Sequence, residues 1–308
     1  MFLKHILCVG TNNNQKVAVV TGSSSGIGFE TSLLLSRNQF VTYATMRILK
    51  KSDELLKIAY KERIPLKVIQ LDVNDDSLVI SAIDIIVKEN GRIDVLVNNA
   101  GYDLFGSLEE LTIDEIKGQF ETNFFGVIRA CTAVIPTMRK QGSGTIVNIS
   151  SLRGRIGLVP FLTAYHASKY AVEGFTKSLR QELAQFNIDV ILIEPGAIRS
   201  NFIDNNKTGK NYNPENSPYA GTIQKIFEGF QSIMADSSHP RVVAEMILRA
   251  VNTSYPNVRY PVGKDAEYIL KIRTELSNNE LEKWVRESYM DKKGFIRERS
   301  IISTNENK

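Results

Sequence analysis

Seven short runs of β-branched and apolar residues alternate with amphipathic segments along the chain. Runs of this length predict buried strands rather than helices. Strands that alternate with helices in this rhythm indicate an α/β fold, a doubly wound parallel sheet of about seven strands with helices on both faces. The predicted strands are Lys16–Thr21, Val41–Thr45, Leu66–Gln70, Val95–Val97, Thr145–Ile149, Asp189–Ile193 and Val258–Val262.

The segments between these strands carry helical patterns. Ser52 is a candidate N-cap, and Gly91 is a signal for the end of a helix. Thr112–Gln141 is expected to form one long helix that Pro136 interrupts near its end. The other predicted helices are Ser52–Arg63, Asp75–Asn90, Thr163–Gln185 and a segment that ends at Asn252.

The chain divides into three predicted parts. Residues 1–15 are expected to be a loose N-terminal extension, 16–265 a single α/β domain and 266–308 a helical C-terminal tail. The domain contains a polar stretch rich in Asn, Gly and Pro within residues 199–238, and a long loop of this kind in a compact domain is usually functional or disordered. The tail is open to three interpretations: a docking helix pair, an oligomer contact or a foot on a membrane surface.

A glycine-rich turn, Gly22–Gly28 (GSSSGIG), separates the first predicted strand from the first helix. Glycines let the backbone approach a pyrophosphate, and the free N–H groups at the start of a helix attract its charge. The spacing G-x-x-x-G-x-G differs from the common G-x-G-x-x-G. A strand, a glycine turn and a helix in this order predict a Rossmann-type dinucleotide site.

The end of the second predicted strand bears on the choice of dinucleotide. A site that selects NAD usually places an acidic residue here to hold the ribose hydroxyls. This chain has Met46 and Arg47 instead, followed by Lys50 and Lys51. Because a guanidinium can stack on adenine and bind a 2′-phosphate, the sequence favours NADP(H) over NAD(H).

Tyr165 and Lys169 lie four residues apart in a segment that is predicted to be helical. Their side chains therefore share one helix face, one turn apart. A hydroxyl donor beside a fixed ammonium suits carbonyl reduction, because the oxyanion must be protonated as hydride arrives. His166 lies next to Tyr165 on a different face and is expected to be structural.

Composition excludes several other classes of function. The hydrophobic content of 43% and the charged content of 23% are ordinary for a globular protein. The net charge of +4 is small and gives no reason to expect nucleic-acid binding. Cys8 and Cys131 form no metal or redox spacing, and none of the three histidines pairs at a zinc-site interval, so no metal is expected.

A reducing, cytoplasmic location fits best. The mildly apolar N-terminus is too short to span a bilayer, and no transmembrane segment is expected.

Seven short motifs occur in an order that resembles the short-chain dehydrogenase/reductase family over roughly residues 16–265. They are TGSSSGIG (21–28), LDV (71–73), NNAG (98–101), TNFFG (122–126), ISS (149–151), YHASK (165–169) and EPGAIRS (194–200). The chain is similar to 17β-hydroxysteroid dehydrogenase type 1 and retinol-dehydrogenase-like members of that family through ATMR, NNAG and YHASKYAVEGF.

The resemblance implies catalytic roles for four residues. Tyr165 would be the general acid or base, Lys169 would lower the pKa of Tyr165 and hold the nicotinamide ribose, and Ser151 would orient the carbonyl oxygen. Lowering a tyrosine pKa from ~10 by about three units requires ~4 kcal/mol, which one ammonium ~4 Å away supplies at an effective dielectric near 20. Asn123 would disturb its helix and anchor a water that relays protons. Ser151 lies 14 residues before Tyr165, one more than is usual in the family, so Ser150 remains the alternative.

The resemblance also implies the cofactor contacts and a substrate lid. The lid would span about residues 199–238. Together with Phe161 it would form an apolar wall suited to an apolar small-molecule carbonyl or alcohol. The lid residues of this wall would be Phe202, Tyr212, Tyr219, Phe227 and Phe230. A homodimer or homotetramer is expected. The cofactor residues would be Gly22, Ser24, Ser25, Gly26, Ile27, Gly28, Arg47, Asp72, Val73, Asn99, Ala100, Gly101, Tyr165, Lys169, Pro195, Gly196, Ile198 and Ser200.

Two functions remain open on this basis. The first is an NADP(H)-dependent oxidoreductase that transfers a hydride between the nicotinamide and a secondary alcohol or ketone. The second is a dinucleotide-binding regulatory or scaffold protein without catalysis, against which the intact set of Asn123, Ser151, Tyr165 and Lys169 argues. The spacing in the glycine turn argues against an extended-type epimerase.

Overall fold

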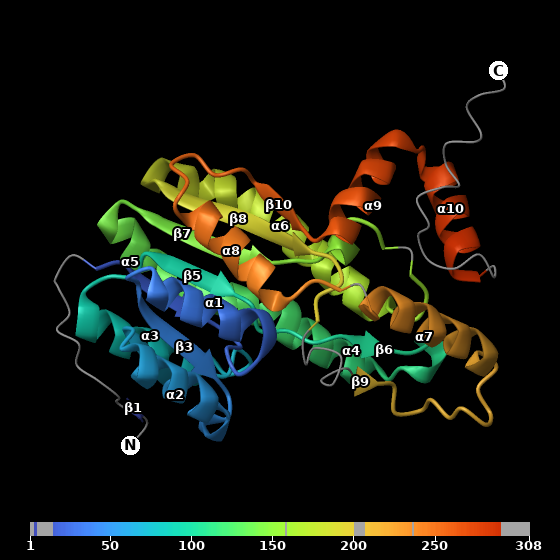
Figure 1. The fold of residues 1–308 in the computed structure, drawn as a ribbon, viewed down its shortest axis with the longest axis horizontal. Helices are drawn as coiled ribbons and strands as arrows, with labels where there is room; N and C mark the ends of the chain where they lie inside the picture. The colour runs from blue at the N-terminus through green and yellow to red at the C-terminus, as the bar shows by residue number, and fades with distance from the viewer. Residues whose placement is uncertain (1–2, 5–14, 158, 200–206, 236, 291–308) are drawn as a thin grey trace.

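A twisted sheet forms the middle layer of the molecule, with helices on both faces (Figure 1). The computed structural model describes residues 3–4, 15–157, 159–199, 207–235 and 237–290. The sheet has seven parallel strands, as the sequence predicts, and one antiparallel strand at its edge. In spatial order the strands are β1 (Leu3–Lys4), β4 (Leu66–Gln70), β3 (Val41–Met46), β2 (Val17–Val20), β5 (Val95–Asn98), β7 (Gly144–Ile149), β8 (Ile188–Pro195) and β10 (Arg259–Val262).

The strand order reverses between β2 and β5. The chain runs outward from β2 through β3 to β4, then crosses back to pair β5 with the other side of β2. Val19 of β2 lies opposite Tyr43 of β3 on one side and Leu96 of β5 on the other. In open parallel sheets, such a reversal opens a crevice at the carboxyl ends of the strands.

Alternate residues of the central strands pack against the helices on the two opposite faces of the sheet. Val17 and Val19 of β2 belong to the core beneath α3 (Asp76–Asn90), α5 (Gly126–Gln141) and α6 (Thr163–Leu183). Ala18 and Val20 belong to the core beneath α1 (Gly26–Arg37) and α8 (Pro240–Val251). A third cluster seats α2 (Asp53–Glu62) against β3 and β4. Burial on both faces explains why these strands are continuous apolar runs.

The predicted long helix 112–141 breaks at a different place from the one expected. It consists of α4 (Ile113–Phe120), a π-helical turn at Glu121–Phe125 and α5, and Pro136 lies inside α5 without ending it. The break at Pro136 was therefore the wrong expectation. The π turn contains Asn123, whose Oδ1 accepts from the N–H of Tyr102 (3.1 Å) and whose Nδ2 donates to the Tyr102 carbonyl (2.9 Å).

The described part of the predicted lid lies beside α4, at the same end of the molecule as the C-terminal helices (Figure 1). Strand β9 (Lys207–Thr208) pairs in parallel with β6 (Leu104–Phe105), and α7 (Ala220–Ala235) follows. The predicted helical tail contains α9 (Lys264–Glu275) and α10 (Asn278–Met290). Ile269 and Leu270 of α9 pack against Leu152 and Ile156, directly after β7.

The N-terminal extension is described only in part. Leu3–Lys4 pairs with β4 and so adds an edge to the sheet, while the remainder of residues 1–14 lies outside the described residues. No described helix is both long and apolar enough to cross a membrane.

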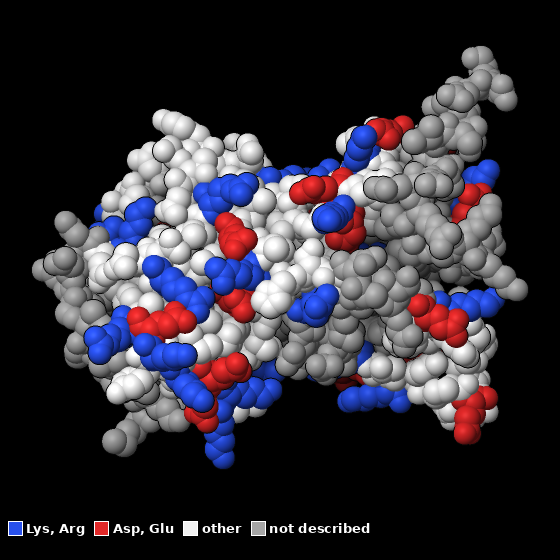
Figure 2. All heavy atoms as spheres, viewed as in Figure 1, with Lys and Arg blue, Asp and Glu red and all other residues white. Residues whose placement is uncertain are grey.

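Basic and acidic side chains are intermingled on the face shown in Figure 2. Several of them pair between elements, such as Arg37 of α1 with Glu62 of α2 at 2.6 Å. Surface pairs of this kind contribute little to stability. That the chain binds no nucleic acid stays a prediction.

Leu96 tests the central packing, because it is fully buried in β5 between the helical layers. Leu96→Ala should lower the free energy of unfolding by about 2–5 kcal/mol through lost contacts and a cavity. Leu108→Ala, at a position that is 62% exposed, is the control and should change it by less than about 0.5 kcal/mol. Urea denaturation measures both, and equal effects would contradict this packing.

Candidate active site

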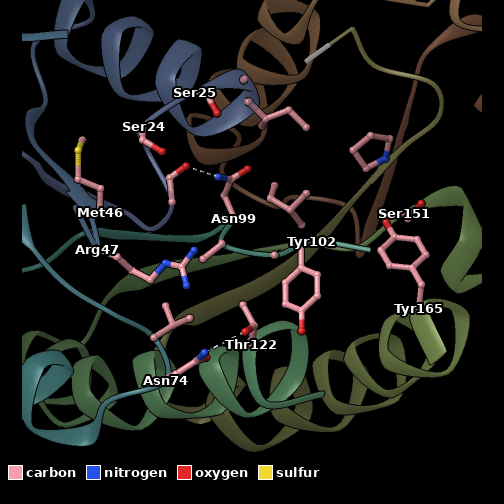
Figure 3. Close-up of a pocket in the computed structure, with 18 of the residues that line it drawn as sticks. Ser24, Ser25, Met46, Arg47, Asn74, Asn99, Tyr102, Thr122, Ser151 and Tyr165 are labelled. Atoms are coloured by element: carbon pink, nitrogen blue, oxygen red, sulfur yellow. Dashed lines mark hydrogen bonds between the residues drawn. The ribbon is translucent and has the colours of Figure 1, made fainter. Parts of the chain in front are cut away.

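A pocket of about 790 Å³ opens where the strand order reverses, at the carboxyl ends of β2, β3, β5, β7 and β8 (Figure 3). It contains most of the residues that the sequence predicts for cofactor and catalysis. The predicted residues that line it are Gly22, Ser24, Ser25, Gly26, Ile27, Arg47, Asp72, Val73, Asn99, Ala100, Gly101, Ser151, Tyr165, Lys169, Pro195, Gly196 and Ile198.

Two of the predicted cofactor and catalytic residues that the structure describes do not line this pocket. Gly28 lies beneath the glycine turn, and Asn123 is 1% exposed behind the pocket wall. Ser200, like Phe202 of the predicted lid, lies outside the described residues.

The glycine turn forms one end of the pocket, and its glycines are required by contact. Gly22 has φ +69°, and a Cβ there would lie 2.8 Å from the Cα of Ala100. A Cβ on Gly28 would lie 2.5 Å from the Nδ2 of Asn99. The same Asn99 Nδ2 donates to the carbonyls of Thr21 (2.9 Å) and Gly22 (3.0 Å). The turn therefore presents bare backbone and the start of α1, the arrangement that admits a pyrophosphate.

Basic side chains border the pocket at the end of β3. Arg47 reaches into the pocket from the strand end, and Lys51 also lines it (Figure 3). Burial raises the pKa of Tyr102, and the nearby Arg47 opposes that rise. Near Arg47, the side-chain amide of Asn74 donates a hydrogen bond to the hydroxyl of Thr122 at 3.0 Å (Figure 3). This end of the pocket combines positive charge with hydrogen-bonding groups.

Ser151, Tyr165 and Lys169 meet at the opposite end. Tyr165 forms a hydrogen bond with Ser151, which lies directly after β7. Lys169, one turn along α6, donates from Nζ to the carbonyl of Ile149 at 2.8 Å and lies 5.8 Å from the centre of the Tyr165 ring. All three side chains are buried.

The two candidate serines differ in their contacts. Ser151 reaches Tyr165, and its Oγ accepts a hydrogen bond from the N–H of Arg153 at 3.1 Å. Ser150 also lines the pocket, but its Oγ is buried, has no hydrogen-bond partner among the described residues, and lies against Gly154. The geometry favours Ser151, and its role stays a prediction.

Asn123 reaches the helix of Tyr165 indirectly. Its Nδ2 donates to the Oγ of Ser168 at 3.2 Å, and that hydroxyl donates to the carbonyl of Tyr165 at 2.7 Å. Asn123 thus joins the π turn, the loop at Tyr102 and α6. The water relay that the resemblance implies stays a prediction.

The structure does not bear out the expected lowering of the Tyr165 pKa by Lys169. Burial raises the pKa of Tyr165, and a nearby Asp103 raises it further, while the hydrogen bond from Ser151 and the charge of Arg153 oppose the rise. Burial also lowers the pKa of Lys169 to about 8. Since Lys169 is hydrogen-bonded to a carbonyl and is itself desolvated, it does not compensate for the burial of the phenol.

Ten residues line the pocket without having been predicted as site residues, although Ser150 was the alternative to Ser151, and Met46 and Lys51 were noted beside Arg47. Thr122 stands within a quoted motif and could have been found, and Asn74 directly follows another. Tyr102 also directly follows a quoted motif. Lys207 carried no such signal, because the pairing of β6 with β9 brings its Nζ within 4.3 Å of the centre of the Tyr102 ring. The ten are Met46, Lys51, Leu71, Asn74, Tyr102, Gly118, Thr122, Ile149, Ser150 and Lys207.

No group of three metal-ligating side chains lies close enough together to hold a metal ion within the described part of the chain.

This fold and pocket define a dinucleotide-binding oxidoreductase. The chain belongs to the short-chain dehydrogenase/reductase family, because residues 16–211 match the family model described as short chain dehydrogenase.

Individual relatives agree with that assignment. The 3-ketodihydrosphingosine reductase of Bacteroides thetaiotaomicron is 36% identical over 248 residues, 80% of this chain and 88% of that protein. The retinol dehydrogenase 8 of Bos taurus is 36% identical over 259 residues, 79% of this chain and 80% of that protein. The retinol-dehydrogenase-like resemblance is thereby confirmed.

Solved structures support the fold and the nucleotide site. A short-chain dehydrogenase from Streptomyces avermitilis has a TM-score of 0.75 at 33% identity, over 88% of this chain and 97% of that one. ElxO with NADP bound has a TM-score of 0.69 at 27% identity, over 82% of this chain and 99% of that one.

His166 gives a pH test of the packing around Tyr165. Burial lowers the pKa of His166 from 6.5 to about 3, and its Nε2 has no hydrogen-bond partner among the described residues. Below pH 6.5, His166 is therefore protonated in the unfolded chain but stays neutral in the folded chain. The free energy of unfolding falls as the pH falls below 6.5. At about pH 5 the free energy of unfolding is lower by about 2 kcal/mol for this reason. His166→Gln should show a smaller loss of stability between about pH 7 and pH 5 in urea denaturation, whereas identical losses would contradict the burial.

Proposed function

We propose that this chain is an NADP(H)-dependent oxidoreductase that interconverts a secondary alcohol and a ketone, with Tyr165 as the general acid or base. The observation that carries the proposal is the composition of one pocket. A glycine turn suited to a pyrophosphate stands at one end, and Ser151, Tyr165 and Lys169 stand at the other. A dinucleotide bound along the pocket would have its pyrophosphate at the first end and its nicotinamide at the second.

The residues present fit such a cofactor. The glycine turn offers backbone where any side chain would collide, as at Gly22 and Gly28. Asp72, Val73, Asn99 and neighbouring residues would hold the adenosine half, and Pro195, Gly196 and Ile198 would border the nicotinamide half. When bound, the nicotinamide supplies or accepts the hydride.

The catalytic side chains would then control one oxygen and one proton. Ser151 would donate a hydrogen bond to the carbonyl oxygen and orient it. Tyr165 would give its proton to that oxygen as the carbonyl is reduced, or take it back as the alcohol is oxidised. Since the pKa of Tyr165 is raised, the phenol is held protonated at neutral pH, which is the form that reduction needs. Lys169 would hold the nicotinamide ribose and stabilise the phenolate left after transfer.

A preference for NADP(H) is supported by charge. Arg47 and Lys51 line the pocket at the end of β3, where an NAD-selective site usually has a carboxylate. A 2′-phosphate placed there would gain charge-assisted hydrogen bonds. The binding of NADP to ElxO agrees with this preference.

An apolar substrate is supported by the surroundings of Tyr165. Its ring packs in a cluster with Phe105, Ile223 and Ile226, and the predicted wall residues Phe161, Tyr212 and Tyr219 pack against that cluster. The ring of Phe227 contacts that of Phe105 in a tilted arrangement, with 4.8 Å between ring centres, and the side chain of Phe230 lies outside the described residues. The names of the relatives, a ketosphingoid reductase and a retinol dehydrogenase, also point to long apolar substrates. A cytoplasmic location and a homodimer or homotetramer stay predictions.

Tyr165→Phe tests the acid directly, because it removes one hydroxyl and keeps the ring. Turnover of NADPH with long-chain ketones should fall about 10²–10⁴-fold while NADPH still binds. Tyr170→Phe, on the same helix and 47% exposed, is the matched control and should keep the wild-type rate. Wild-type protein that binds NADPH but reduces no ketone would support a scaffold role instead.

Arg47→Leu tests the choice of cofactor. Loss of a charge-assisted hydrogen bond should raise the Kd for NADPH about 10–100-fold, while the Kd for NADH stays within about threefold. Lys50→Leu is the control, since Lys50 is exposed and does not line the pocket. Fluorescence titration measures both constants. An equal change for NADPH and NADH would overturn the assignment of Arg47 to the 2′-phosphate.

A further inference from the structure

Asp265 joins the C-terminal tail to the wall of the pocket, and none of the roles proposed above uses it. It lies in the first turn of α9 and is partly buried. Its Oδ2 accepts a hydrogen bond from the N–H of Ala197 at 2.7 Å. Ala197 stands between Gly196 and Ile198, which both line the pocket. The carboxylate therefore holds the backbone of a segment whose neighbours on both sides form the pocket wall.

Two glycines make room for this carboxylate. A Cβ on Gly196, directly after β8, would overlap the carboxyl group of Asp265. A Cβ on Gly263, directly after β10, would lie 2.8 Å from its Oδ1. Gly263 also has φ +109°, a conformation that side chains rarely adopt. Contacts with two separate segments thus fix the position of the carboxylate.

The segment after β8 is held from two sides. On one side, the N–H of Gly196 donates to the last carbonyl of β10 at 2.9 Å. On the other side, the N–H of Ser238 donates to the carbonyl of Ala197 at 3.0 Å, and the N–H of Arg199 donates to the carbonyl of Ser238 at 2.8 Å. These three bonds join backbone groups. The bond to Asp265 is a fourth, and a change of one side chain can remove it.

Helix α9 also supports the turn that begins at Ser151. Its residues Ile269 and Leu270 pack in one buried cluster with Leu152 and Ile156. Leu152 directly follows Ser151 in the chain. The first helix of the tail therefore contacts the segment after β7 as well as the segment after β8, and both segments belong to the reacting end of the pocket.

We propose that Asp265 is a positioning residue that holds residues 196–198 in the conformation that receives the nicotinamide half of the cofactor. The first helix of the tail is then part of the active site and not a separate attachment. This inference rests on the proposed function, since it deepens the description of the same cofactor site.

Loss of the carboxylate would act on one end of the pocket. The N–H of Ala197 would lose its acceptor, and the backbone would turn to find another, because a backbone N–H that is shielded from water needs a partner. The glycine turn lies at the other end of the pocket and is held by different contacts, such as those of Asn99. Binding of the nicotinamide half should therefore weaken, while binding of the phosphates and the adenosine should not.

The test compares two ligands, NADPH and 2′-phospho-ADP-ribose, which lacks the nicotinamide. Asp265→Ala should raise the Kd for NADPH about tenfold, the worth of one hydrogen bond to a charged group, and change the Kd for 2′-phospho-ADP-ribose by less than about threefold. Calorimetry on the whole chain measures both constants. Glu267→Ala is the matched control, because it removes an exposed carboxylate from the same turn of α9, and it should change neither constant.

Two further variants separate the hydrogen bond from the charge and from the stability of the helix. Asp265→Asn keeps an oxygen that can accept from the N–H of Ala197, so its Kd for NADPH should stay within about threefold of the wild-type value. Asp265→Ser keeps a polar side chain at the start of α9, but its hydroxyl is one bond too short to reach that N–H. It should show the same selective loss as Asp265→Ala, and it decides the matter if Asp265→Ala does not fold.

The outcomes distinguish this inference from the proposed function. Equal losses for the two ligands, or an unchanged affinity for NADPH in Asp265→Ala and Asp265→Ser, would overturn the role of Asp265. A wild-type chain that binds neither ligand would contradict the use of NADP(H), and this inference with it. A selective loss of NADPH affinity in a chain that reduces no ketone would contradict the proposed reaction and leave the assignment of Asp265 intact.

Discussion

The pocket depends on the hydrogen bonds that hold the ends of β2 and β5 together. The hydroxyl of Thr21 accepts from the N–H groups of Asn99 (3.0 Å) and Ala100 (3.1 Å), and the Asn99 amide returns two bonds to the carbonyls of Thr21 and Gly22. These contacts fix the glycine turn at the reversal of strand order. The turn cannot close over the crevice, and its backbone remains directed at a ligand. Every proposed role further along the pocket assumes a cofactor anchored at this point.

Burial sets the chemistry at the other end. Tyr165 and Lys169 are both desolvated, so each is pushed towards its neutral form: the pKa of the phenol is raised and that of the ammonium is lowered to about 8. A neutral phenol can donate a proton, and nearby positive charge favours its ionisation. A bound oxidised nicotinamide would bring such charge. The proposed proton transfer therefore depends on the cofactor as well as on Ser151, Tyr165 and Lys169.

The sequence predicted the sheet well and the site in part, for different physical reasons. Buried parallel strands such as Val17–Val20 are continuous apolar runs, and the glycine turn shows its own spacing of glycines, so both leave local signals. The contacts that require Gly22 and Gly28 come from Ala100 and Asn99, far away in the sequence. The π turn at Asn123 left little, because it is stabilised by Tyr102, 21 residues away. Lys207 left none. Its position follows from the pairing of β6 with β9, which no local pattern encodes.

A crystal structure of the protein with NADPH and a long-chain alcohol is the most direct test of this account. It should show the pyrophosphate on Gly22–Gly28, the 2′-phosphate at Arg47, and the substrate hydroxyl within hydrogen-bond reach, about 3 Å, of both Ser151 and Tyr165. A nicotinamide directed away from Tyr165, or a cofactor bound outside the glycine turn, would contradict the central claim.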